Sequence, residues 1–128
     1  MIYLDSSVVL AQLLAENRQP AEALWRENLL SSRLLEYEIW SRIHALGLTK
    51  THTEEVRRFL GRISLLEMTP TILDRAIDPF PVPLRTLDAL HLASIEYARG
   101  EDHGVRLASY DNRMTAAARA IGIGLYDL

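Results

Sequence analysis

The stretch IYLDSSVVLAQLLAE, residues 2–16, contains the pattern that decides the fold. Ile2–Asp5 is short, apolar and rich in residues that favour strands, so we expect a buried strand at the start of the chain. Ser6 or Ser7 is a suitable N-cap for a helix over Val8–Glu16. The stretch therefore predicts a strand that ends in an acid and turns at once into a helix.

The alternation of strand and helix continues to the end of the chain. Further strands are expected over 29–32, 64–68, 105–109 and 124–126. Helices are expected over 21–27, 33–46, 56–62, 87–99 and 112–121, with a short one after Thr69-Pro70. Strands that alternate with helices predict an α/β fold with three layers, α/β/α, in which helices flank a mainly parallel sheet.

Local signals set the expected ends of these helices. Thr51 and Glu54 have the spacing of a capping box, and Thr86 is the expected cap of the helix that follows it. Gly100 is the expected stop of that helix. The proline-rich stretch 78–83 cannot be regular structure and is expected to be a loop.

Length and composition indicate one compact domain over residues 1–128, with 48% hydrophobic and 24% charged residues. The absence of cysteine excludes disulfides and thiolate metal sites, and fits a reducing cytoplasm. The first residues lack a basic segment and reach Asp5 almost at once, so we expect neither a signal peptide nor a membrane span. The net charge of −3 argues against tight binding of nucleic acid unless a cation supplies positive charge.

Two acids follow expected strands. Asp5 ends the first strand and Asp111 lies just beyond the fourth. In open α/β sheets, ligands bind outside the carboxyl ends of the strands, so each acid is a candidate site residue. Each is also explained by a simpler role, as a helix cap or a turn residue.

Two further acids lie on expected helices. Asp88 is near the start of its helix, where the helix dipole favours a negative charge. Its neighbours are almost wholly apolar, so it should be buried, and a buried carboxylate needs a partner such as a metal ion. Glu38 lies on a helix that must pack on the sheet. Glu36, on the same helix, is the rival candidate and is more simply explained as a solvated residue; the preference for Glu38 rests mainly on the resemblance described below.

Acids that converge on one pocket repel one another, and a hard cation relieves this repulsion. Mg²⁺ or Mn²⁺ takes oxygen ligands, and near a phosphodiester it can activate a water molecule. The spacing of these four acids does not by itself show that they converge.

Four blocks of the sequence resemble the motif blocks of PIN domains. They are IYLDSS at 2–7, SSRLLEYE at 31–38, LRTLDALHLA at 84–93 and ASYDNRM at 108–114. The chain is most similar to the VapC ribonuclease toxins of type II toxin–antitoxin systems. The blocks occur in the family's order along the whole chain, and the block around Asp88 is the most specific. Ser109 stands where the family often has threonine, which keeps the hydroxyl group.

The resemblance implies a function and a site. It implies a metal-dependent endoribonuclease that hydrolyses RNA phosphodiesters, with Mg²⁺ or Mn²⁺ as cofactor. The implied catalytic residues are Asp5, Glu38, Asp88 and Asp111, and Asp5, Asp88 and Asp111 are the implied metal ligands. It also implies a homodimer and a small VapB-like antitoxin that blocks the site. The RNA target does not carry over, because it varies widely within the family.

Other polar residues near these acids have two explanations each. Ser7 and Ser109 are candidates for orienting water, or have capping and turn roles. Arg85 and Arg113 either contact RNA phosphates or neutralise the acids as ion pairs. For His91 we favour a hydrogen-bonded histidine in a helix interface over a metal ligand.

The aromatic side chains also have two explanations. They are either stacking platforms for bases or core and dimer contacts, and we favour the second. The residues concerned are Trp25, Tyr37, Trp40 and Phe59. Because the early helices carry many apolar and aromatic residues, we expect the dimer to form on helical faces.

Three rival functions remain open at this point. A catalytically weak PIN-like module would bind RNA or protein without cleaving it. A phosphoacceptor signalling domain needs an acidic pair after an early strand and a lysine after a late one, whereas here only Asp5 ends the first strand and Lys50 lies in mid-chain. A dehalogenase-type phosphatase needs a second aspartate where Ser7 stands.

Overall fold

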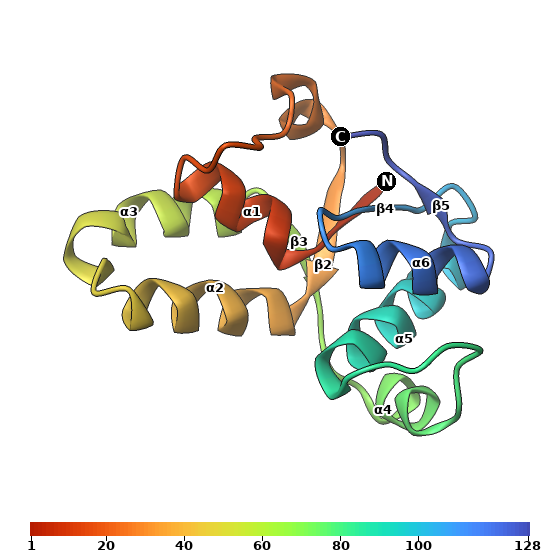
Figure 1. The fold of residues 1–128 in the computed structure, drawn as a ribbon. Helices are drawn as coiled ribbons and strands as arrows, with labels where there is room; N and C mark the ends of the chain where they lie inside the picture. Colours follow the sequence, from red (N-terminus) through yellow and green to blue (C-terminus); the bar gives the residue numbers. More distant parts are fainter.

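The computed structural model describes residues 1–128 and contains one five-stranded parallel sheet in the order β3-β2-β1-β4-β5 (Figure 1). The strands are β1 Ile2–Leu4, β2 Leu29–Ser32, β3 Ser64–Leu66, β4 Arg106–Ala108 and β5 Gly124–Leu125. The helices are α1 Ser6–Leu13, α2 Arg33–Ala45, α3 Thr49–Leu60, α4 Pro70–Ile77, α5 Thr86–Glu101 and α6 Asn112–Ala120, with a 3-10 helix, η1, at Glu22–Arg26. The expected three-layer α/β/α fold is confirmed. The chain has no helix with the length and apolar character that crossing a membrane requires.

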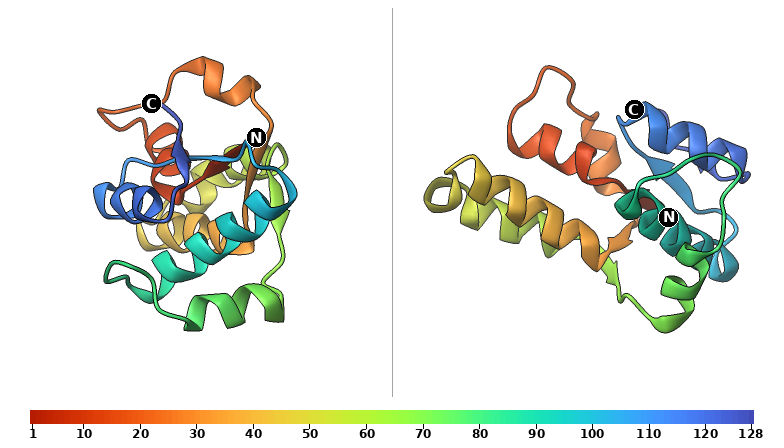
Figure 2. Two further views of the ribbon diagram at one scale, coloured as in Figure 1. Left: turned by 90° about the vertical axis from the view of Figure 1, so that its right-hand side faces the viewer. Right: turned by 60° about the horizontal axis from the view of Figure 1, so that its bottom comes forward.

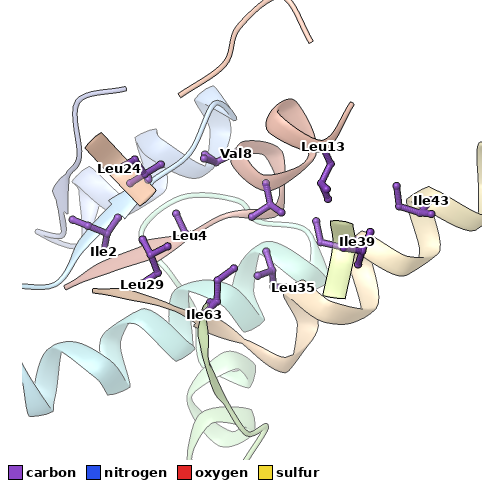
Figure 3. Packing of buried hydrophobic residues seen from close by; sticks show 13 residues of the cluster. Ile2, Leu4, Val8, Leu13, Leu24, Leu29, Leu35, Ile39, Ile43 and Ile63 are labelled. Atoms are coloured by element: carbon purple, nitrogen blue, oxygen red, sulfur yellow. The ribbon is translucent and has the colours of Figure 1, made fainter. Parts of the chain in front are cut away.

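Two hydrophobic clusters lie on opposite faces of the sheet. Successive side chains of a strand point to opposite faces, so Ile2 and Leu4 of β1 belong to one cluster and Tyr3 to the other. The first cluster packs against α1, α2 and α3 (Figure 3), and the second against α5 and α6. Figure 1 and the right view of Figure 2 show these two groups of helices on separate sides of the sheet, with α4 beside α5.

The strand order places the direction change of the fold between β1 and β4. From β1 the chain moves outward to β2 and β3, then crosses back to pair β4 with the other edge of β1. Such a switch point leaves a crevice at the carboxyl ends of the two strands, because the connections there leave in opposite directions. Asp5 follows β1 and Asp111 follows β4, so both acids lie at this crevice.

Several expected helix boundaries were wrong. The helix expected over 21–27 is only the short 3-10 helix η1, and α1 stops at Leu13 instead of reaching Glu16. The capping box is absent because α3 begins at Thr49, which places Thr51 inside the helix. Thr86 is the first residue of α5 and not its cap, and α5 continues through Gly100. These errors share a cause. Where a helix begins and ends depends on how it packs in the fold, and a local capping signal does not settle it alone.

Candidate active site

A cleft of about 560 Å³ opens beside the carboxyl ends of β1 and β4. Its lining brings together four carboxylates from four separate parts of the chain. Two belong to the loops after strands and two to helices, and they are Asp5, Glu38, Asp88 and Asp111. The structure therefore gathers into one cleft all four acids that the sequence singled out.

Asp5 is nearly buried, with 7% of its surface exposed. It occupies the N-cap position of α1, yet its side chain makes no capping hydrogen bond. Its Oδ2 atom instead accepts hydrogen bonds from the hydroxyls of Ser7, at 2.6 Å, and Ser109, at 2.8 Å. The capping explanation therefore fails for this side chain, and its second oxygen, Oδ1, has no protein donor.

Ser7 and Ser109 connect Asp5 to the loop between β4 and α6. The Ser7 hydroxyl also accepts a hydrogen bond from the backbone N–H of Tyr110, at 3.0 Å. The Ser109 hydroxyl accepts one from the backbone N–H of Asp111, also at 3.0 Å. Of the two roles open in the sequence, these bonds give both serines a turn role, and they hold the Asp5 carboxylate in place.

Asp111 caps helix α6. Its Oδ1 atom accepts hydrogen bonds from the backbone N–H groups of Arg113, at 2.9 Å, and Met114, at 3.3 Å. The capping explanation is thus right for this oxygen. The other oxygen, Oδ2, accepts no protein hydrogen bond, so capping does not exhaust the side chain's capacity to bind a ligand in the cleft.

Asp88 lies in the first turn of α5 and is 7% exposed. Its Oδ2 atom is buried and accepts no hydrogen bond. The nearest cation is Arg85, whose Nε lies 3.6 Å from Oδ2, too far for a hydrogen bond, and whose side chain is 68% exposed. Arg85 therefore acts as a weak ion-pair partner, and Asp88 retains an unsatisfied buried oxygen.

Glu38 belongs to a chain of hydrogen bonds that reaches into the core. Its Oε1 lies 2.5 Å from Nε2 of His91, and Nδ1 of His91 lies 2.8 Å from the hydroxyl of Tyr3. Because an ionised carboxylate only accepts hydrogen bonds, Nε2–H donates to Glu38 and the Tyr3 O–H donates to Nδ1. Burial raises the pKa of Tyr3 above its ordinary value, so the phenol keeps the proton that it donates.

The favoured explanation of His91, a hydrogen-bonded histidine in a helix interface, is confirmed. Its ring is almost completely buried between α5, α2 and β1. Its hydrogen-bond partner at Nε2 is Glu38. The sequence analysis missed this contact, which joins residues 53 positions apart. Glu38 also accepts a long 3.4 Å bond from Ser6, a cleft residue that the sequence singled out only as a helix cap.

The four carboxylates share the cleft without forming a closed metal site. No three Asp, Glu or His side chains are arranged closely enough to hold a cation. The donor chemistry nevertheless fits one, since Asp5, Asp88 and Asp111 each keep an oxygen that accepts no hydrogen bond, and that of Asp88 is buried. Hard cations such as Mg²⁺ bind carboxylate oxygens, and one would supply the partner that Asp88 lacks.

Three other sequence candidates lie outside the cleft lining. Arg113 contributes its backbone N–H to Asp111 while the residue itself is exposed. Glu36 forms an ion pair with Arg33 at 2.9 Å, as expected for a solvated helix residue. Lys50 lies in the first turn of α3 and does not line the cleft, so the arrangement of a phosphoacceptor domain is absent.

Most of the aromatic candidates pack against the core. The rings of Trp25 and Phe59 meet edge to face with their centres 5.1 Å apart. Trp40 is partly buried and stacks on His44. Tyr37 differs, because 68% of its surface is exposed. The favoured explanation, packing instead of base stacking, is therefore confirmed as core contact for Trp25, Trp40 and Phe59 and not for Tyr37.

Known proteins match nearly the whole chain. The PIN domain family model matches residues 2–120. Ribonuclease VapC46 of Mycobacterium tuberculosis is 35% identical over 127 residues, which cover 97% of this chain and 95% of that protein. Ribonuclease VapC35 of the same organism is 30% identical over 131 residues, with coverages of 98% and 95%. Ribonuclease VapC47 is 27% identical over 129 residues, with coverages of 95% and 93%. No solved structure gives a significant match.

Proposed function

The chain belongs to the PIN domain family, and from this membership we propose that it is a metal-dependent endoribonuclease that hydrolyses RNA phosphodiester bonds. The observation that carries the proposal is the gathering of Asp5, Glu38, Asp88 and Asp111 in one cleft at the switch point of the sheet. The names of its relatives support the same reaction, since each is described as a ribonuclease.

We assign a role to each acid. Asp5, Asp88 and Asp111 would hold Mg²⁺ or Mn²⁺ through the oxygens that accept no hydrogen bond from the protein. When bound, the cation supplies positive charge that lowers the pKa of water and stabilises the negative charge of the reacting phosphate. Glu38 is the fourth catalytic residue, and it accepts a proton from the attacking water or orients that water.

The chain's own hydrogen bonds prepare these acids for the reaction. Ser7 and Ser109 hold Asp5 through one oxygen and leave the other available. His91 holds Glu38 through Oε1, so that Oε2 keeps only the long bond from Ser6 and can accept one from water. A carboxylate held in this way does not have to reorganise when the phosphate reacts.

The proposal extends to a protein partner and to a second copy of the chain. The relatives' names support the toxin of a VapBC-type pair, so we propose that a VapB-like antitoxin blocks the cleft and that the protein acts in the cytoplasm. We also propose a homodimer. Exposed apolar side chains gather on α4 and α5, where Ile77 is 81% exposed and Leu73, Leu87 and Tyr97 are each more than 40% exposed. Light scattering of the purified chain that shows only monomer at high concentration would contradict the dimer.

The experiment for the proposed function compares wild type with Asp5→Asn. Single-stranded RNA is incubated with each protein in Mn²⁺ or in excess chelator, and thermal melting is recorded in chelator. Wild type should cleave only with the cation, and Asp5→Asn should not cleave at all, because it loses the charge that holds the cation. Its melting temperature should stay level or rise, since repulsion among the acids decreases.

The matched control is Asp74→Asn on the exposed surface of α4, outside the cleft. It should cleave like wild type. Cleavage by Asp5→Asn at the rate of this control, or cleavage by wild type in chelator, would refute the proposal. RNA binding by wild type without cleavage under any cation would indicate instead a catalytically weak binding module.

A further inference from the structure

A second cleft, of about 630 Å³, adjoins the acidic one. The two clefts share Ser7, Leu10 and Asp111, so they form a continuous depression at the edge of the molecule where α1 and α2 meet the loop after β4. We call the second one the arginine cleft, defined by Arg18, Arg42 and Tyr110, which line it and do not line the acidic cleft.

Arg42 lies one helical turn beyond Glu38 on α2. Residues four apart share a face of a helix, separated by about 6 Å along its axis, so a ligand that contacts Glu38 is within reach of Arg42. The guanidinium of Arg42 takes part in none of the chain's ion pairs or side-chain hydrogen bonds. It is therefore free to bind an anion in the cleft.

Arg18 and Tyr110 form the opposite part of the cleft. The Arg18 guanidinium lies 4.8 Å from the centre of the Tyr110 ring. Tyr110 is partly buried against the core, and its backbone N–H is held by Ser7, so the ring is anchored next to Asp111. A planar cation over an anchored aromatic ring offers a flat surface on which a nucleobase can stack.

Charge favours an anionic strand in this position. The acidic cleft alone repels phosphates, and the chain as a whole carries a net charge of −3. Glu16 is the only acid of the arginine cleft that does not also line the acidic one, so the two arginines outnumber it. Positive charge next to the acids attracts the phosphates of an RNA strand, so that the strand can extend from one cleft into the other.

We propose that the arginine cleft binds the RNA nucleotide next to the phosphodiester that is cut, with Arg42 on its phosphate and its base stacked on the Arg18–Tyr110 pair. This inference rests on the proposed function. It further specifies the substrate as single-stranded or looped RNA, because a base can stack on a side chain only when it is free of its own helix.

The test measures binding separately from cleavage. A short fluorescent single-stranded RNA of mixed sequence is titrated by anisotropy, in Mg²⁺, against Asp5→Asn and against the same protein with Arg42→Gln, Arg18→Gln or Tyr110→Ala. The control is Arg58→Gln, an exposed arginine of α3 outside both clefts. Arg42→Gln should weaken binding about tenfold and reduce the slope of log affinity against log salt by about 0.7.

Tyr110→Ala should weaken binding without changing the salt slope, because stacking involves no phosphate, and Tyr110→Phe should restore it. In the active protein, Arg42→Gln should raise KM and leave kcat nearly unchanged. Variants that bind RNA like Arg58→Gln, with the same salt slope, would overturn the inference even if wild type cleaves RNA. A wild type that does not cleave RNA under any cation refutes the proposed function separately.

Discussion

Replacing His91 by leucine removes the middle of the hydrogen-bond chain from Tyr3 to Glu38. Leucine is close to histidine in volume, so packing changes little while both hydrogen bonds are lost. The Tyr3 hydroxyl is completely buried and donates to His91, and the hydroxyls of Ser31, Ser32 and Ser94 lie close to it. The Glu38 side chain is 19% exposed, so water can replace part of what His91 donates.

The expected loss of stability follows from these burials. An orphaned buried hydroxyl costs about 1–3 kcal/mol, and the lost hydrogen bond to a partly solvated carboxylate adds about 1 kcal/mol. We expect the free energy of unfolding to fall by about 2–4 kcal/mol. For a chain of this length, 1 kcal/mol corresponds to about 4 °C in melting temperature, so His91→Leu should melt roughly 8–16 °C lower.

The double variant Tyr3→Phe/His91→Leu separates the hydrogen-bond chain from simple packing. Without the hydroxyl, leucine at position 91 leaves no buried donor unsatisfied. The double variant should therefore be about 1–2 kcal/mol more stable than the sum of the two single changes predicts. Urea unfolding of the four proteins measures this coupling. Changes that add to within about 0.5 kcal/mol would refute the reasoning, since independent sites add in this way.

Enzyme activity gives a second test of the hydrogen bonds that link Tyr3, His91 and Glu38. If His91 positions Glu38, then His91→Leu should lower kcat far more than it raises KM, because the carboxylate acts on the reacting water and not on substrate binding. His91→Gln, whose amide can still donate to Glu38, should recover part of kcat. Equal losses for leucine and glutamine would argue that the ring serves packing alone.

Three further outcomes are expected. Ser109→Ala, which removes one of the two donors to Asp5, should lower kcat at least tenfold and cost about 1–3 kcal/mol in urea unfolding; unchanged kcat would exclude a positioning role. In chelator, Asp88→Asn should melt at the same temperature as wild type or higher, because the buried Oδ2 of Asp88 accepts no hydrogen bond that the change could remove. A clearly lower melting temperature in calorimetry would contradict this. Ile39→Ala, in the fully buried first cluster, should cost about 2–5 kcal/mol without altering KM; a smaller loss would mean that the core closes around the cavity.

Three of the four candidate acids were predictable because each has a local signature. Asp5 comes directly after an apolar strand, and Asp88 stands in a segment too apolar for an unpaired carboxylate. Glu38 was the weakest of the four, since nothing local separates it from Glu36. The structure separates them, because Glu38 lines the cleft and Glu36 pairs with Arg33 outside it.

The helices, the strands and the way they are connected could be predicted from the sequence. Short apolar segments that favour strands alternate with helical ones, and a helix between two strands makes the strands parallel, so the three-layer fold follows from short-range patterns. The contacts between side chains far apart in the sequence could be seen only once the chain was folded. Ser109 reaches Asp5 across 104 positions because β4 pairs with β1, and His91 reaches Glu38 because α5 and α2 approach from opposite faces of the sheet. Such contacts depend on strand order and on the packing of every helix at once, and no local stretch of sequence contains that information.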